Sequence, residues 1–323
     1  MSKLQKALQK LRSSEVPIPP GRHRHSGGEA RSGTDREVPP ESALGRLNSR
    51  RDEYLTEETS IREKLPEPEI SISLEMLSDQ GYQPNREDLE LVAQQFRRIK
   101  RPILQVAFRA GSAAGENANV IMIASALPKT GKTFCSFSLA VSIARERDVG
   151  SVLVDADVLK PNISRVLGLD ERIGLIDYLL DPALTIDDIL VPTETYGIVV
   201  VPAGQQHEEA TELLASRRMK QFIENTSERF RSRAIIVDTP PLLLTNEAHV
   251  LAELMGQIVL VIDAGISTQE SVVEVLSTLN RAKPINAILN KARSKSVEGY
   301  SGDGYGYYGA PQGGRRYANR KEE

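Results

Sequence analysis

The chain has 323 residues, a formal net charge of −3 at pH 7 and a charged fraction of 26%. This length leaves room for one large domain with extensions, and the charge balance favours neither nucleic acid nor lipid as a partner. A single cysteine, Cys135, excludes a disulfide framework and a cysteine-based metal site and fits a reducing compartment. We expect a cytoplasmic protein without a transmembrane segment, because no apolar run is long enough to span a bilayer and no signal-peptide core is visible.

Residues 1–14 are expected to form a short basic amphipathic helix. Its apolar residues follow helical spacing: Leu4, Ala7, Leu8 and Leu11. Such a helix either docks on a membrane partner or an anionic lipid surface, or frays or packs on its own domain. Residues 15–84 change to a composition rich in Pro, Gly, Ser, Arg and Glu, which predicts a flexible linker.

From Asn119 onward, short apolar runs alternate with helical stretches. The runs are too continuously apolar for strands with one wet face, which indicates the buried strands of a parallel sheet. The predicted strands are residues 120–126, 151–157, 197–204, 234–240, 257–264 and 285–291. A helix is predicted over residues 132–147. Strands that alternate with helices predict an α/β domain over residues 85–298, with a doubly wound, mainly parallel sheet.

The first predicted strand runs into ALPKTGKTF, which fits the phosphate-loop pattern of P-loop NTPases. Backbone N–H groups at the start of the next helix are expected to hold phosphates, aided by the helix dipole. Lys132 would reach the β- and γ-phosphates, and the Thr133 hydroxyl would bind Mg²⁺. The predicted nucleotide contacts are Pro128, Lys129, Thr130, Gly131, Lys132, Thr133 and Phe134. A chance match on an α/β scaffold is the alternative.

Two predicted strands end in carboxylates. Asp155 and Asp157 lie two residues apart, so their side chains point the same way from an extended segment, toward the phosphate pocket. One is expected to join the magnesium shell while the other orients a nucleophile; alternatively, Asp157 only caps the following helix. Asp238 ends another apolar strand and is assigned to Mg²⁺, directly or through water. Asn290 and Lys291 follow the last strand, at the place where adenine commonly rests in such sheets. Alternatively, they form an ordinary turn.

These motifs make the chain resemble the bacterial tyrosine kinases, which are P-loop kinases of exopolysaccharide export related to the MinD/ParA ATPases. Within that family it is most similar to the tyrosine autokinase associated with exosortase-type polysaccharide clusters. The resemblance covers about residues 85–320. It rests on QQFRRIKRPIL (94–104), SALPKTGKTF (125–134), LVDADVLKP (153–161), VPAGQQHEEATELLAS (201–216), VDTPPLLLTNEA (237–248), ILNKA (288–292) and the tyrosine-rich end of the chain.

The resemblance implies an ATP- and Mg²⁺-dependent protein tyrosine autokinase. It assigns Lys132 and Thr133 to ATP and Mg²⁺ and places Asp155 and Asp238 at the metal. Asp157 would be the base that accepts the tyrosine proton, because a phenol with a pKa of about 10 stays protonated at neutral pH.

The tyrosine-rich tail, residues 299–323, would be the substrate and would be presented in trans to a neighbouring subunit. Each phosphate would add about −1.5 to −2 charges, so that the modified tail and the oligomer would repel each other. The predicted phosphoacceptors are Tyr300, Tyr305, Tyr307, Tyr308 and Tyr317. The alternative is that this Gly/Tyr-rich segment is merely disordered and cohesive.

The family forms rings through an E-x-x-R-x-x-R segment before the core. The aligned residues here are Gln94, Arg97 and Lys100, which lack the glutamate, and the alternative is a solvated basic face. The resemblance also implies a membrane chain-length or copolymerase protein of polysaccharide export and a protein tyrosine phosphatase as partners, with peripheral recruitment to the inner face of the cell membrane. No nucleic acid is implied.

Two departures from the family lie near the nucleotide. Lys129 and Thr130 stand where relatives usually carry Gly and an acidic residue, and Leu159 stands where an arginine is usual. Two other functions stay open. One is a MinD/ParA-like ATPase switch that hydrolyses ATP without phosphorylating tyrosine, although Leu127 replaces the lysine of those switches. The other is a non-catalytic scaffold, to which Lys129 gives weight.

Overall fold

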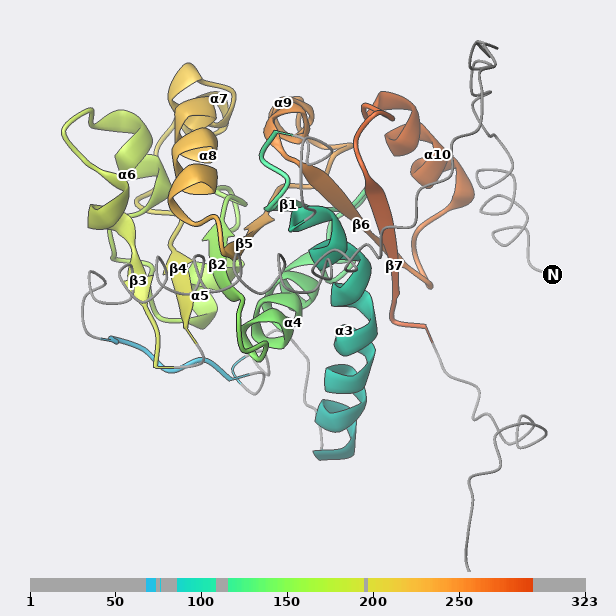
Figure 1. The fold of residues 1–323 in the computed structure, drawn as a ribbon. Helices are drawn as coiled ribbons and strands as arrows, with labels where there is room; N and C mark the ends of the chain where they lie inside the picture. Colours follow the sequence, from blue (N-terminus) through green and yellow to red (C-terminus); the bar gives the residue numbers. More distant parts are fainter. Residues whose placement is uncertain (1–67, 74–75, 77–85, 109–115, 195–196, 293–323) are drawn as a thin grey trace, which may run out of the picture. The chain divides into compact units, whose positions relative to one another are not determined.

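The computed structural model describes residues 68–73, 76, 86–108, 116–194 and 197–292 (Figure 1). The predicted N-terminal helix, most of the predicted linker and the five tail tyrosines lie outside these residues. The chain divides into two units, residues 1–291 and 292–323, and the fold described below belongs to the first. Within the described ranges, no helix combines the length and the apolarity that crossing a membrane requires.

In the part of the chain that the structure describes, seven strands form one sheet in the order β3-β4-β2-β5-β1-β6-β7. Every neighbouring pair is parallel except β3 with β4. The strands are β1 (Val120–Ala124), β2 (Gly150–Asp155), β3 (Val191–Pro192), β4 (Ile198–Val201), β5 (Arg233–Asp238), β6 (Gln257–Asp263) and β7 (Ile285–Asn290). The six strands predicted from apolar runs are therefore confirmed. The short antiparallel edge strand β3 was not predicted.

The helices cover both faces of the sheet (Figure 1). They are α3 (Arg86–Ala107), α4 (Lys132–Ala144), α5 (Asn162–Val166), α6 (Leu175–Leu180), the 3-10 helix η2 (Ile186–Ile189), α7 (Ala210–Leu214), α8 (Arg217–Arg229), α9 (Glu247–Leu254) and α10 (Gln269–Thr278). Side chains alternate along a strand, so Ile121 and Ile123 pack with α3, α4 and α5. Val120 and Met122 pack with α6 to α10 on the other face. The predicted doubly wound architecture is confirmed.

A short stretch of the predicted linker 15–84 belongs to the folded domain instead. Ile70 forms a parallel bridge with Thr193, the Glu69 N–H donates to the Pro192 carbonyl at 3.1 Å, and Ile72 is only 4% exposed. The prediction was wrong here because a few residues that pair with an edge strand carry no periodic pattern.

The sheet order determines where the functional groups meet. Strands β2, β5 and β1 are neighbours and parallel, so the segments that follow them emerge at one edge. This edge carries the predicted phosphate loop after β1, Asp155 and Asp238 at the last positions of β2 and β5, and Asp157 just beyond β2. In open α/β sheets this edge is the usual place for a ligand.

Candidate active site

The predicted phosphate loop lies between β1 and α4. Gly131 caps the N-terminus of α4 with φ 92°, and Lys129 adopts φ 61°. A side chain at Gly131 would overlap the amide nitrogen of Asn290, so this position requires glycine for both its backbone angle and its space. The N–H groups at the start of α4 are suited to bind phosphate oxygens.

Phe134, predicted at the nucleotide, directs its ring elsewhere. The ring packs edge-on against Phe96 of α3, with centroids 6.2 Å apart. Its side chain therefore stabilises the contact between α3 and α4. Only the backbone of this residue belongs to the start of the phosphate-loop helix.

The ends of β6 and β7 hold the phosphate loop by its carbonyl groups. The Asn290 amide donates to the Thr130 carbonyl at 2.8 Å, and the Lys291 ammonium donates to the Lys129 carbonyl at 2.6 Å. Lys291 also pairs with the Asp263 carboxylate at 2.8 Å. We call Asp263, Asn290 and Lys291 the loop clamp. Asn290, predicted near adenine, thus fixes the loop backbone in this structure.

Asp238 is tied to the beginning of α4. Its Oδ2 accepts a hydrogen bond from the Thr133 hydroxyl at 2.8 Å, and its Oδ1 accepts one from Ser136 at 3.1 Å. Ser136 was not predicted. Its spacing of three residues from Thr133 places both hydroxyls on one helix face, which is the signal that could have indicated it.

Asp155 lies directly opposite Asp238 in the register of β2 and β5. Its Oδ2 accepts two hydrogen bonds from Ser164 of α5, from the N–H and from the hydroxyl, each at 2.8 Å. The Ser164 hydroxyl in turn accepts from the Ala203 N–H at 2.9 Å. No sequence signal marks Ser164, because a lone serine in a short helix has no distinctive pattern.

Burial makes the carboxylates of this site hold their protons more tightly than usual. Burial, and then the charge of Asp238, raise the pKa of Asp155 to about 8. Burial raises the pKa of Asp238 to about 6, although Lys132 opposes the shift. Burial also raises the pKa of Asp157, again against the charge of Lys132. The site therefore brings together one lysine and three carboxylates.

Asp157 does not cap the following helix. Helix α5 begins after Pro161 and has no side-chain cap. The carboxylate is instead almost fully buried and close enough to Lys132 for the lysine charge to influence its pKa.

The donor set fits a divalent cation. Asp155 Oδ1 is buried and has no hydrogen-bond partner among the described residues, and a buried carboxylate oxygen without a partner is costly. A cation beside it would favour the charged form of the carboxylate. The described ranges contain no cluster of three or more His, Cys, Asp or Glu side chains that could hold a metal. A cation here would need further oxygens from phosphates and water, as Mg²⁺ commonly does.

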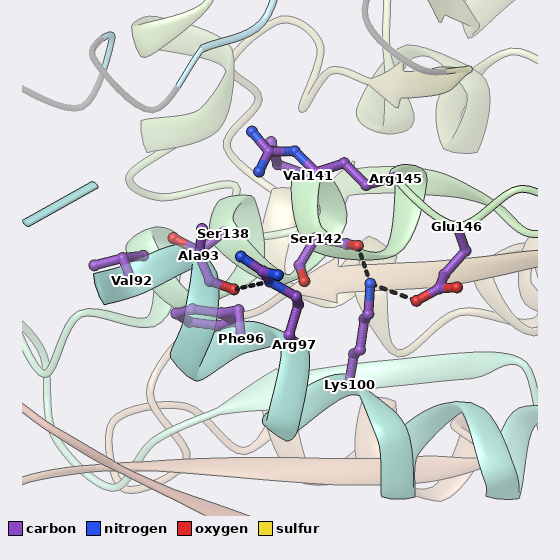
Figure 2. Close-up of a pocket in the computed structure, with 10 residues that line it drawn as sticks. All are labelled: Val92, Ala93, Phe96, Arg97, Lys100, Ser138, Val141, Ser142, Arg145 and Glu146. Carbon is purple, nitrogen blue, oxygen red and sulfur yellow. Dashed lines mark hydrogen bonds and ion pairs between the residues drawn. The ribbon is translucent and has the colours of Figure 1, made fainter. Parts of the chain in front are cut away.

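The three predicted oligomer contacts differ in exposure. Gln94 and Arg97 are exposed on α3. Lys100 is 5% exposed, donates to the Ser142 carbonyl and pairs with Glu146 at 2.7 Å (Figure 2). Its ammonium is therefore engaged within the chain, where it joins α3 to α4.

No family model matches the chain. Tyrosine-protein kinase YwqD of Bacillus subtilis is 32% identical over 193 residues, which make up 58% of this chain and 77% of that protein. Succinoglycan biosynthesis transport protein ExoP of Rhizobium meliloti is 32% identical over 193 residues, and the chain spans only 24% of its length.

The fold is similar to that of the kinase domain of the Escherichia coli tyrosine kinase ETK. The TM-score is 0.54 at 24% identity, over 75% of this chain and 88% of that one. This likeness concerns the fold alone, whereas the sequence similarity to YwqD extends over 77% of that protein. The chain belongs to the bacterial tyrosine kinase family.

Proposed function

We propose that the chain is an ATP- and Mg²⁺-dependent protein tyrosine autokinase. It transfers the γ-phosphoryl group of ATP to tyrosines of the segment 299–323, in trans within an oligomer. The observation that carries this proposal is the buried group of Lys132, Asp155, Asp157 and Asp238 beside a phosphate loop with a glycine cap. Membership of the tyrosine kinase family supports it.

In this proposal, the loop positions the triphosphate while the carboxylates serve separate roles. The N–H groups at the start of α4 and the Lys132 ammonium bind the phosphates. The Asp157 carboxylate accepts the proton of a tyrosine hydroxyl as the phenolic oxygen bonds to the γ-phosphorus. The bond from that phosphorus to the bridging oxygen breaks, and ADP leaves with the bond's electron pair. A base with a raised pKa suits this proton transfer, since it retains the proton more readily than an exposed aspartate.

Thr133, Asp155 and Asp238 would hold Mg²⁺, which supplies charge neutralisation at the phosphates. Ser136 and Ser164 orient the two aspartates by the hydrogen bonds described above. Residues that form hydrogen bonds with a metal ligand fix the direction in which that ligand points.

The wider role that we propose is regulation of exopolysaccharide polymerisation or export. ExoP is named for succinoglycan biosynthesis and transport, which supports a role of this kind. We further propose a ring-like oligomer with Gln94 and Arg97 at a contact, a membrane copolymerase and a protein tyrosine phosphatase as partners, and an exosortase-associated polysaccharide cluster as the context. The chain would act in the cytoplasm and be recruited peripherally to the inner face of the cell membrane.

Mass spectrometry of the full chain tests the activity. After phosphatase treatment, incubation with Mg²⁺ and ATP should place phosphate on tyrosines of residues 299–317. Asp157→Asn should lose this phosphorylation and retain ATP binding, because Asp157 is assigned to proton transfer. Lys132→Met should lose both.

Asp170→Asn is the matched control, since this carboxylate is exposed and has no proposed role. Hydrolysis of ATP without phosphotyrosine would favour an ATPase switch, and absence of ATP binding would favour a scaffold. Either result would contradict the proposed kinase.

A further inference from the structure

The turn after β2 carries an exposed apolar residue and an exposed lysine next to the carboxylate that we propose as the base. Residues 157–160 form this turn, which is closed by a hydrogen bond from the Lys160 N–H to the Asp157 carbonyl at 2.9 Å. In such a turn the Cα atoms of the first and fourth residues lie within about 7 Å of each other. Asp157 and Lys160 are therefore neighbours at the edge of the candidate active site.

The turn is anchored on both sides. Val158 is 6% exposed and packs in the core on one face of the sheet. Pro161 precedes α5 with φ −71°, and a proline restricts the backbone of the residue before it. Leu159 is 56% exposed, and Lys160 is exposed too. The turn thus presents both side chains to solvent from a fixed base. We call Leu159 and Lys160 the substrate rim.

Lys160 adds positive charge at this place. Burial raises the pKa of Asp157, and the charges of Lys132 and Lys160 oppose this rise, so the Lys160 ammonium lies near the carboxylate. Within the described residues, no ion pair engages this ammonium. An anionic group of a substrate would find a partner here, and a cationic group would be repelled.

The segment 299–323 offers two acceptor tyrosines that differ in charge at the same position. Asp303 precedes Tyr305 by two residues, and Arg315 precedes Tyr317 by two residues. When a peptide binds in an extended form, residues two apart point to the same side and lie roughly 7 Å apart.

This separation matches the one across the turn. A tyrosine whose hydroxyl reaches Asp157 can therefore place the side chain two residues before it at Lys160. An acidic residue at that position suits the rim, whereas a basic one does not.

We propose that the substrate rim docks the acceptor segment of a second copy of the chain, and that Lys160 selects the tyrosine by the charge two residues before it. The inference rests on the proposed autokinase and specifies its substrate preference. Leu159 contacts the tyrosine ring, and Lys160 pairs with the Asp303 carboxylate. Tyr305 is therefore phosphorylated before Tyr317, whose preceding arginine is repelled.

The order of phosphorylation tests the selection within one chain. The phosphatase-treated full chain is incubated with Mg²⁺ and ATP, and early samples are analysed by mass spectrometry. The initial rate at Tyr305 should exceed that at Tyr317 at least about fivefold. Lys160→Glu should reverse this preference, and adding Asp303→Lys to that variant should raise the Tyr305 rate about fivefold again. Lys220→Glu, at an exposed lysine of α8, is the matched control and should leave the ratio unchanged.

Peptide binding tests the rim without requiring kinase activity. The probe is a fluorescent peptide of residues 301–309, titrated with the full chain in the absence of nucleotide. The same peptide with Asp303→Lys should bind about tenfold more weakly to the wild type, and Lys160→Glu should invert this difference. The difference should shrink in high salt. Leu159→Ser should weaken binding several-fold, whereas Val273→Ser, at an exposed apolar residue of α10, should not.

Equal early rates at Tyr305 and Tyr317, an unchanged ratio in Lys160→Glu, or equal binding of the two peptides would each overturn the proposal. A further contrary result would be Lys160→Gln that loses ATP affinity and retains charge-dependent peptide binding, because Lys160 would then serve the nucleotide. These failures are distinct from failure of the kinase. A chain that phosphorylates both tyrosines at equal rates keeps the proposed function and loses the rim. A chain that binds the peptides by charge but makes no phosphotyrosine does the reverse.

Discussion

The loop clamp provides a prediction that separates support of the phosphate loop from direct contact with ATP. Lys291→Met removes the donor to the Lys129 carbonyl and the ion pair with Asp263. A hydrogen bond from a charged group contributes about 1.5–3 kcal/mol. The Lys291 side chain is 52% exposed, so solvent reduces this to roughly 1 kcal/mol. If the bond holds the loop in its binding-competent geometry, the Kd for ATP should rise about fivefold.

Calorimetric titration with ATP in the presence of Mg²⁺ would measure this change, alongside thermal unfolding. The Tm should fall by no more than about 2–4 °C for a domain of this size. Lys220→Met is the matched control, since Lys220 is exposed and forms a surface ion pair with Glu224 at 3.6 Å. An unchanged Kd would refute the supporting role. A loss beyond a hundredfold would refute it too, because it would indicate that Lys291 contacts ATP itself.

Three further predictions concern the site. Gly131→Ala should abolish ATP binding in a titration, because its φ of 92° and the Asn290 amide leave no place for a side chain; binding like wild type would contradict this. Asp155 has its pKa raised to about 8, so its contribution to stability is present below about pH 4 and is lost as pH rises to about 8. In urea unfolding of the metal-free proteins, the free energy of unfolding should therefore fall less between pH 5 and 8 for Asp155→Asn than for the wild type. An equal fall in both proteins would count against the raised pKa. Ser164→Ala should increase the Mg²⁺ concentration needed for half-maximal phosphorylation by several-fold, and no change would show that Ser164 does not orient Asp155.

The sequence predicted the central sheet because its strands are buried on both faces. Continuous apolar runs such as β5 and β6 have no other stable location in a soluble domain. The phosphate loop and the acidic strand ends could be predicted for a related reason. Their chemistry depends on residue types at fixed spacing, and the ends of neighbouring parallel strands necessarily meet.

Features that depend on tertiary contact could not be predicted. Strand β3 has two residues, and the stretch around Ile70 pairs with it without any periodicity. Ser164 acts on Asp155 of the preceding strand and Asp263 acts through Lys291 of a later one, and no local spacing marks either residue. Lys100 was assigned to an oligomer contact by alignment with the family's E-x-x-R-x-x-R segment, whereas the structure buries this residue and pairs its ammonium with Glu146.

The central claim is that Asp157 accepts a proton from tyrosine at a site that binds ATP. The most direct measurement is phosphotyrosine on residues 299–317 after incubation with Mg²⁺ and ATP, compared between the wild-type chain and Asp157→Asn at equal ATP occupancy. Multiple phosphorylated tyrosines are expected in the wild type and essentially none in the variant. Equal phosphorylation in both proteins, or none in either with ATP bound, would contradict the claim.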